Sequence, residues 1–346
     1  MSHVSDYFQT LGQTMASQLG DHPEPDSVFA AIATDVLSAV PAPPIDVLAM
    51  ADWAGQQDPL PKQVNFKSGF GQPPLVVFVA PGFYIEVLFW FPSRTGIHGH
   101  GFTGAFRVLN GCSVQVEYRF LEESAPEEGL RLGKLVAQGI EMVAPGKVCS
   151  ILGRDDFIHC VAHLGNPSLT LVARTYGSKD LRQFSFHRCG FALRAKYQQQ
   201  TMERQAAVLA AVFKARPAAF RERLLAYLAA TDCAACYAVL SELKSLLAFP
   251  VFTKQVLPAV RERFGATHAP ALAALDEDVR SNGIWGLIGK LNDPRQQLQH
   301  ALTELFPDER ERDALICQSL GVADAQPVLA EWLRIAEQSS APPATG

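Results

Sequence analysis

Residues 96–111 read GIHGHGFTGAFRVLNG, and the fold that we expect follows from this stretch. It carries His98 and His100 two residues apart, among glycines and β-forming residues. Side chains two residues apart on a strand point to the same face of a sheet, so both imidazoles can reach one metal ion. His159, in a second β-rich stretch, can add a third nitrogen from another strand and leave positions open for substrate or dioxygen.

The surrounding residues 62–195 have the pattern of an antiparallel sheet. Short runs rich in β-branched and aromatic residues alternate with Gly, Pro, Asn and Asp, and no long helical pattern separates them. The glutamate-rich residues 121–129 predict a solvated loop. The expected strands cover residues 75–80, 84–91, 104–109, 113–120, 135–140, 148–151, 158–161, 169–176 and 183–186.

Helical patterns precede and follow the β-rich region. Apolar residues recur at helical spacing in residues 28–40 and 45–55, within an N-terminal helical segment of residues 1–61. Residues 196–338 predict an all-α domain of roughly six to eight amphipathic helices, with prolines marking the breaks. Residues 339–346 read as a disordered tail.

Composition and charge argue against nucleic acid and membrane as binding partners. The chain has 346 residues, a formal net charge of −5 at pH 7 and no basic cluster, so we expect no nucleic acid. The longest apolar run, residues 74–91, is interrupted by Pro81, Gly82 and Glu86, so we expect no membrane span. Residues 1–20 lack a secretory signal, and the seven cysteines have no disulfide-framework spacing, which indicates a cytoplasmic protein with reduced thiols.

The stretch 96–111 resembles the first motif of the cupin superfamily, in which a glycine precedes His-x-His, an acidic ligand and a closing glycine. Gly111 takes the closing position, and counting back from it places Gly104 where the acidic ligand belongs. Residues 157–172 resemble the second cupin motif, which carries the third histidine, here His159. The resemblance covers about residues 64–190 and implies an α+β chain built on a cupin-type antiparallel β-barrel, or double-stranded β-helix.

A cupin with three histidines and no carboxylate resembles the thiol dioxygenases, such as cysteine and 3-mercaptopropionate dioxygenase. Residues 83–90, which end in Trp90 shortly before the histidine pair, are similar to the corresponding strand of that family. The resemblance implies a non-haem Fe(II) site, dioxygen as co-substrate and oxidation of a small thiol to a sulfinate. It does not extend to the helical residues 196–338.

Two residues are candidates for a substrate-orienting role, which the family gives to a tyrosine near the iron. Spacing from His159 selects Tyr176, whereas an alignment anchored at Pro167 selects Arg174. Residues 174 and 176 share one face of a strand, so either side chain can contact a substrate. His163 is the rival of His159 as third ligand.

Some features leave the function open between classes. Cysteine dioxygenase holds its substrate carboxylate with an arginine on an early strand, whereas residues 67–75 contain only Lys67 as a cation. One alternative is therefore a cupin oxygenase acting on a non-thiol small molecule in a biosynthetic pathway. Another is a non-enzymatic metal- or ligand-binding cupin. In each case the helical domain can cover the barrel, form a homodimer or bind a protein partner.

Overall fold

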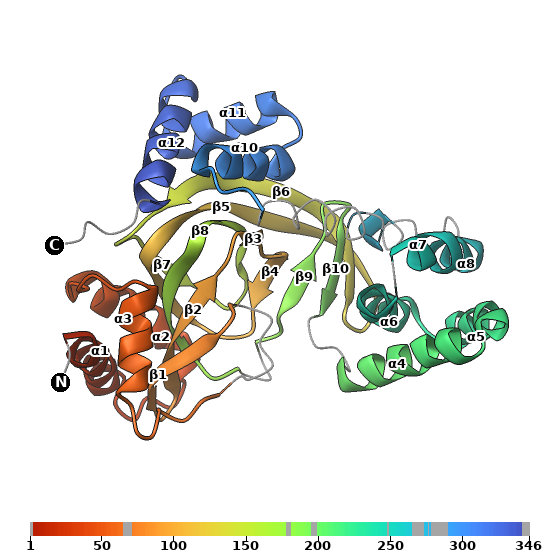
Figure 1. The fold of residues 1–346 in the computed structure, drawn as a ribbon, viewed down its shortest axis with the longest axis horizontal. Coiled ribbons are helices and arrows are strands. Elements are labelled where there is room, and N and C mark those ends of the chain that lie inside the picture. Colours follow the sequence, from red (N-terminus) through yellow and green to blue (C-terminus); the bar gives the residue numbers. More distant parts are fainter. Residues whose placement is uncertain are drawn as a thin grey trace. The chain divides into compact units, whose positions relative to one another are not determined.

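The computed structural model describes residues 3–64, 71–177, 181–194, 199–247, 249–264, 273–275, 277 and 290–340 (Figure 1). The chain divides into two compact units. The first comprises residues 1–119, 137–183 and 285–346, and the second comprises residues 120–136 and 184–284. These units follow neither the expected boundary at residue 61 nor that at 195, and the domain division drawn from the sequence stays a prediction.

Three helices open the first unit: α1 (His3–Leu19), α2 (Pro25–Ala39) and α3 (Val47–Gly55). Asp46 caps α3, because its carboxylate accepts a hydrogen bond of 2.8 Å from the Ala49 N–H. Their apolar faces form one hydrophobic cluster with strand residues that include Phe83 and Ile85. Burial of this cluster holds the helices against one face of the sheet.

The described strands of the sheet pair antiparallel wherever a register is defined. They are β1 (Pro74–Ala80), β2 (Phe83–Trp90), β3 (Ser93–Arg94), β4 (Ile97–His100), β5 (Gly104–Glu127), β6 (Leu130–Val143), β7 (Val148–Ile151), β8 (Arg154–Thr175), β9 (Phe184–Phe186) and β10 (Phe191–Arg194).

Strand β8 organises the part of the sheet that belongs to the first unit. One edge of β8 pairs with β5 along most of its length. The other edge pairs in succession with β4, β3 and β2. The residues that pair with β4 and those that pair with β2 therefore lie on one continuous strand.

The long strands β5 and β8 differ from the sequence-based expectation. Each was predicted as two strands, but each runs through with a register irregularity, and Gly111 at φ +74° lies within the one in β5. The predicted loop 121–129 is wrong, because β5 continues to Glu127 and β6 begins at Leu130 after a turn at Gly129, where φ is +81°. Glu122 and Glu123 are exposed strand residues, since a ribbon open to water can carry charge, and Glu128 lies in the turn.

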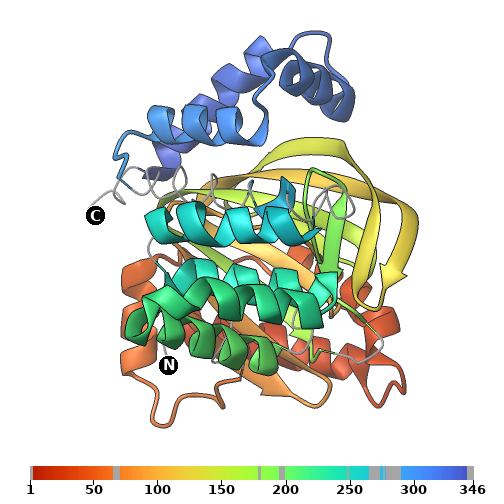
Figure 2. The same cartoon turned by 90° about the vertical axis from the view of Figure 1, so that its right-hand side faces the viewer.

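The last helices of the chain belong to the first unit. They are α10 (Pro294–Leu305), α11 (Glu309–Leu320) and α12 (Gln326–Ser340), and Figure 2 shows them in blue as one group. They contact the sheet through polar anchors: the Ser319 hydroxyl donates to the Ile140 carbonyl at 3.2 Å, and Gln297 Oε1 accepts from the Gly165 N–H at 3.3 Å. The tail predicted at residues 339–346 lies outside the described residues from 341 onward.

The second unit combines strands and helices around its own core. Strand β10 pairs with β9 and with the start of β6. The helices are α4 (Gln199–Ala215), α5 (Pro217–Ala230), α6 (Cys233–Leu246), α7 (Phe249–Val251) and α8 (Leu257–Phe264), with a π-helical turn at Phe252–Val256. Pro258 does not end its helix as predicted, because the π turn before it accommodates the missing N–H. No described helix is long and apolar enough to cross a membrane.

Gly111 offers a test of the β5 irregularity. A methyl group there would lie 2.5 Å from Ser168 Cβ and 2.8 Å from its Cα, whereas one at Gly146, where φ is also positive, meets nothing within 4 Å. Both alanine variants suffer backbone strain, but only Gly111→Ala adds a clash with backbone. We expect Gly111→Ala to lose about 1–3 kcal/mol more unfolding free energy than Gly146→Ala in urea titrations. Equal losses would show that the close approach of β5 and β8 at Gly111 does not contribute to stability.

Candidate metal centre

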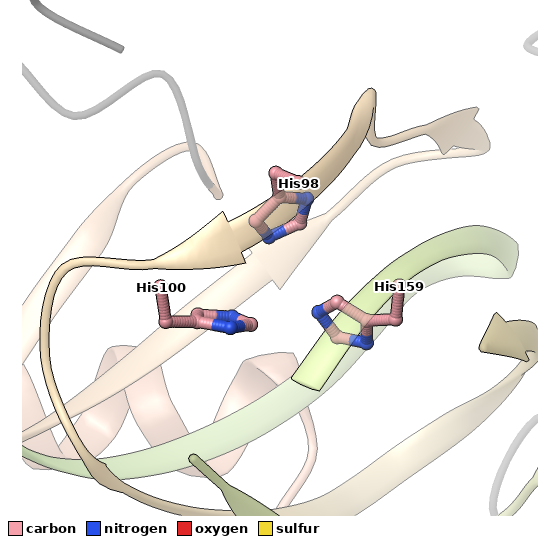
Figure 3. Close-up of side chains that lie close together, drawn as sticks. All are labelled: His98, His100 and His159. Atoms are coloured by element: carbon pink, nitrogen blue, oxygen red, sulfur yellow. The ribbon is translucent and has the colours of Figure 1, made fainter. Parts of the chain in front are cut away.

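Strands β4 and β8 bring three histidines together (Figure 3). His98 and His159 are direct partners in the antiparallel ladder, and their ring centroids lie 4.8 Å apart. The His100 ring lies 4.9 Å from His98 and 5.0 Å from His159. One ligand nitrogen from each ring lies within 4.8 Å of the others. The histidines singled out from the sequence therefore surround one point.

A bulge between β4 and β8 aims His100. The register shifts after the His98–His159 pair, so that His100 partners Arg154. Arg154 has φ +64° and is the one non-glycine residue among those described with a positive φ. Bulges of this kind re-aim side chains next to functional sites. Here the irregular register lets His100 Nδ1 approach the Phe157 carbonyl oxygen, at 3.3 Å.

Hydrogen bonds determine which nitrogen each histidine offers. Nδ1 of His98 lies 2.8 Å from the Gly96 carbonyl oxygen, and Nδ1 of His159 lies 3.0 Å from Gln115 Oε1. The Phe157 carbonyl plays the same part for His100. Carbonyl and amide oxygens only accept, so each Nδ1 carries the proton and each Nε2 carries the lone pair. The three side chains fit a divalent metal ion as Nε2 ligands.

Burial keeps these imidazoles neutral. It lowers the pKa of His98 to about 4, against a smaller opposing effect of the hydrogen bond to Gly96. Burial also lowers the pKa of His100 well below its usual value; proximity to His98 and Arg174 acts in the same direction, and the hydrogen bond to Phe157 opposes it. The pKa of His159 is lowered by burial first and then by the neighbouring histidines. Neutral imidazole is the form that binds metals, so the site needs no proton release at neutral pH.

The structure gives a steric reason for the missing acidic ligand. Gly104 begins β5 opposite Arg174, and a Cβ atom at Gly104 would overlap the carbonyl oxygen of Ala173. A glutamate at this position would require the backbones of β5 and β8 to separate. Among the described residues, the only group of three or more metal-ligating side chains is the set of three histidines.

Aromatic side chains enclose the histidines. The Phe157 ring centroid lies 4.4 Å from that of His159 and stacks at 5.6 Å on His100. Phe102 meets His100 edge-on at 5.1 Å. Both phenylalanines belong to a buried apolar cluster on this side of the sheet. Such walls exclude water and strengthen electrostatic interactions inside the site.

The two candidates for orienting a substrate occupy different surroundings. Arg174 Cζ lies 3.3 Å from the centroid of Phe102, the ring that also meets His100, and Arg174 Nη1 lies 3.5 Å from Glu86 Oε1. Arg174 Nε and Glu86 Oε2 are buried without a hydrogen-bond partner. Tyr176 is 40% exposed and packs on Tyr84 at 5.3 Å. Arg174, but not Tyr176, is therefore linked to the histidines through a shared ring.

Other sequence candidates lie elsewhere. His163 Nδ1 lies 3.0 Å from Ser113 Oγ and its ring stacks on Trp90 at 4.0 Å, so His163 is not part of the three-histidine group. Lys67 lies outside the described residues. Cys233 and Cys236 have the Cys-x-x-Cys spacing of redox motifs, but both are buried, and burial raises the pKa of Cys233 to about 12, which suits packing and not thiol chemistry.

The sequence reasoning did not single out Gln115 or Glu86. Gln115 had a usable signal, because Ser113, Gln115 and Glu117 place polar side chains two residues apart, and the residues between them, Val114 and Val116, are apolar. Glu86 is likewise a single acidic residue within the apolar run of β2. A polar residue on the buried face of a strand needs a partner, and here the partners are His159 and Arg174.

Comparisons with known proteins give distant similarities. No protein-family model matches this sequence, and no curated protein matches it. A structure of DMSP lyases is 14% identical, covers 53% of this chain and 98% of its own, and has a TM-score of 0.27. A hydroquinone 1,2-dioxygenase from Sphingomonas sp. TTNP3 is 12% identical and has a TM-score of 0.24. The match covers 31% of this chain and 68% of the dioxygenase chain.

A sugar phosphate isomerase from a cupin superfamily, from Silicibacter pomeroyi, is 18% identical, covers 34% of this chain and 69% of its own, and has a TM-score of 0.21. For three other similar structures the match spans less than two thirds of the length of the known chain, at 58%, 63% and 61%. At these scores the similarities carry no argument about activity. The case for this site therefore depends on its own geometry.

His163 gives a pH test of the buried cluster. Burial lowers its pKa to about 3. An unfolded histidine titrates near pH 6.5, so this contribution to stability is complete above about pH 6.5 and is lost as the pH falls toward 3. The comparison uses Ser113→Ala and Ser113→Ala/His163→Phe, which both lack the hydroxyl partner of His163 and differ only at residue 163. Between pH 7 and 5 we expect the unfolding free energy of Ser113→Ala to fall about 2 kcal/mol more than that of the double variant. Urea titrations with chelator measure both free energies, and parallel pH profiles would contradict the lowered pKa of His163.

Proposed function

We propose that this protein is a metal-dependent oxygenase of the cupin type, in which His98, His100 and His159 hold one divalent iron. The observation that carries the proposal is that each Nδ1 faces an oxygen acceptor, which leaves each Nε2 as a ligand atom. The low pKa values of the buried histidines and the steric exclusion at Gly104 support it.

The three imidazoles are neutral ligands, so they compensate none of the positive charge of the ion. When bound, Fe(II) would supply a Lewis acid with open positions for a substrate sulfur and dioxygen. Phe102 and Phe157 would keep water from the reacting atoms. Arg174 or Tyr176 would orient the substrate, and the buried positive charge of Arg174 suits a carboxylate.

The proposed reaction is the oxidation of a small thiol to a sulfinate. Both atoms of one dioxygen molecule enter the product: two S–O bonds form and the O–O bond breaks. The sulfur gives up four electrons, which is the number that dioxygen accepts, so no further reductant is required. The S–H proton is released to solvent as the sulfinate forms.

A second candidate is a cupin oxygenase acting on a non-thiol small molecule. The ion pair between Arg174 and Glu86 favours it, because a guanidinium that already faces a carboxylate offers less charge to a carboxylate-bearing thiol. Under this reading the histidines keep their role and only the substrate differs.

Metal content tests the site itself. We expect protein purified without chelators to contain close to one iron per chain, and His98→Ala/His100→Ala to lose it, because one nitrogen cannot hold the ion. Elemental analysis gives the content, and circular dichroism checks that the variant is folded. His163→Phe is the matched control, since His163 lies outside the three-histidine group and should leave the iron content unchanged. Folded, metal-free wild-type protein would contradict the proposal.

Oxygen uptake tests the substrate class. With iron-loaded protein we expect thiol-dependent consumption of one dioxygen per sulfinate formed, measured against 3-mercaptopropionate, cysteine and cysteamine. Removing the ion pair as Glu86→Gln/Arg174→Met should raise KM about 10- to 100-fold for the carboxylate-bearing thiols, because a charged hydrogen bond contributes about 1.5–3 kcal/mol. Cysteamine, which lacks a carboxylate, serves as the control. Absence of uptake with every thiol would favour the non-thiol substrate.

A further inference from the structure

Gln115 connects the histidine cluster to a pair of glutamates. It lies on β5 with 1% of its surface exposed, and its Oε1 is 3.0 Å from His159 Nδ1. Its Nε2 donates to Glu117 Oε1 at 3.3 Å and to Glu141 Oε1 at 3.4 Å. Lys147 Nζ donates to the other oxygen of Glu141 at 2.7 Å. These contacts form a chain from a surface lysine to a buried histidine.

The chain has a direction because its members differ in what they can donate. Carboxylates only accept hydrogen bonds, so the amide nitrogen of Gln115 must face Glu117 and Glu141. The amide oxygen then faces His159, whose Nδ1 must donate to it. A glutamine held by no acceptor could rotate its amide by half a turn and present N–H to the ring. Two carboxylates oppose that rotation.

His159 is the histidine for which this matters. His98 and His100 direct Nδ1 at backbone carbonyls, which cannot reverse their polarity. His159 directs Nδ1 at a side-chain amide, which can. The form of His159 that offers Nε2 to a metal therefore depends on the orientation of Gln115.

We propose that Gln115, oriented by Glu117 and Glu141, is a positioning residue that sets His159 as an Nε2 ligand and raises its affinity for the metal. The inference rests on the proposed function, since it requires that the three histidines bind an ion. Acceptors behind metal-binding histidines fix the ring and increase its basicity, and their loss typically costs 10- to 100-fold in affinity.

Cobalt(II) binding to the full chain is the test, because it reports affinity and ligand geometry without turnover. We expect Gln115→Leu to weaken Co²⁺ binding about 10- to 100-fold and to change the visible absorption of the bound ion. The swap Gln115→Glu/Glu117→Gln keeps the net charge and restores an acceptor to His159, so it should bind Co²⁺ within about threefold of wild type.

The glutamates give a second readout that leaves Gln115 in place. In Glu117→Gln/Glu141→Gln both partners can donate as well as accept, so the amide is no longer held one way. We expect a loss of about tenfold in Co²⁺ affinity, exceeding the product of the two single losses, because either carboxylate alone still orients the amide. The charge-matched control is Glu123→Gln/Glu128→Gln, at two exposed positions, which should bind as wild type does.

The outcomes separate the two proposals. If wild type binds no Co²⁺ through the histidines, with His98→Ala/His100→Ala indistinguishable from it, the proposed function is wrong. If wild type binds and Gln115→Leu has the same Kd and spectrum, the metal site stands and the role of Gln115 is overturned. If Gln115→Leu fails to fold, the glutamate variants decide. A loss of Co²⁺ affinity in Glu117→Gln/Glu141→Gln equal to the product of the two single losses would then overturn the role of Gln115.

Discussion

The pairing of β4 with β8 is the contact on which the candidate metal centre depends. It sets His98 directly opposite His159, and the bulge that follows turns His100 toward the same point. The strand β8 can do this because its other edge pairs with β5, which carries the acceptor for His159. The ladder therefore supplies ring nitrogens from one side and the group that orients them from the other.

The second constraint is burial without charge. Three histidines in a low-dielectric interior avoid the cost of ionisation by staying neutral, and each satisfies Nδ1 with an oxygen. A side chain at Gly104 would overlap the carbonyl oxygen of Ala173, so this position cannot carry an acidic residue without a shift of the backbone. Glu117 and Glu141 accept hydrogen bonds from Gln115, whose amide oxygen faces His159, so both carboxylates are connected to that histidine through the amide.

Much of the fold was predictable because β and helical patterns differ in period. Strand β7 matches its expected range, and helices α2 and α3 lie close to the ranges 28–40 and 45–55 that apolar spacing predicted. The errors fall on strands that continue through turn-like residues. The Asn166–Pro167 dipeptide is typical of a turn, yet it lies within β8, between the residues that pair with β3 and those that pair with β2.

The sequence by itself determined the main residue types of the candidate site: a His-x-His pair on a strand and a later histidine in a second β-rich stretch. The shared orientation of the pair follows from local spacing, since side chains two apart on a strand share a face. The glycine in place of an acidic residue is what the resemblance to the cupin motif implies. Only the tertiary structure decided which ring nitrogen each histidine offers, that Gln115 stands behind His159, and that Arg174 reaches His100 through Phe102. Those relations depend on the register between strands far apart in the chain, and a register shifted by one residue would turn every one of these side chains to the opposite face.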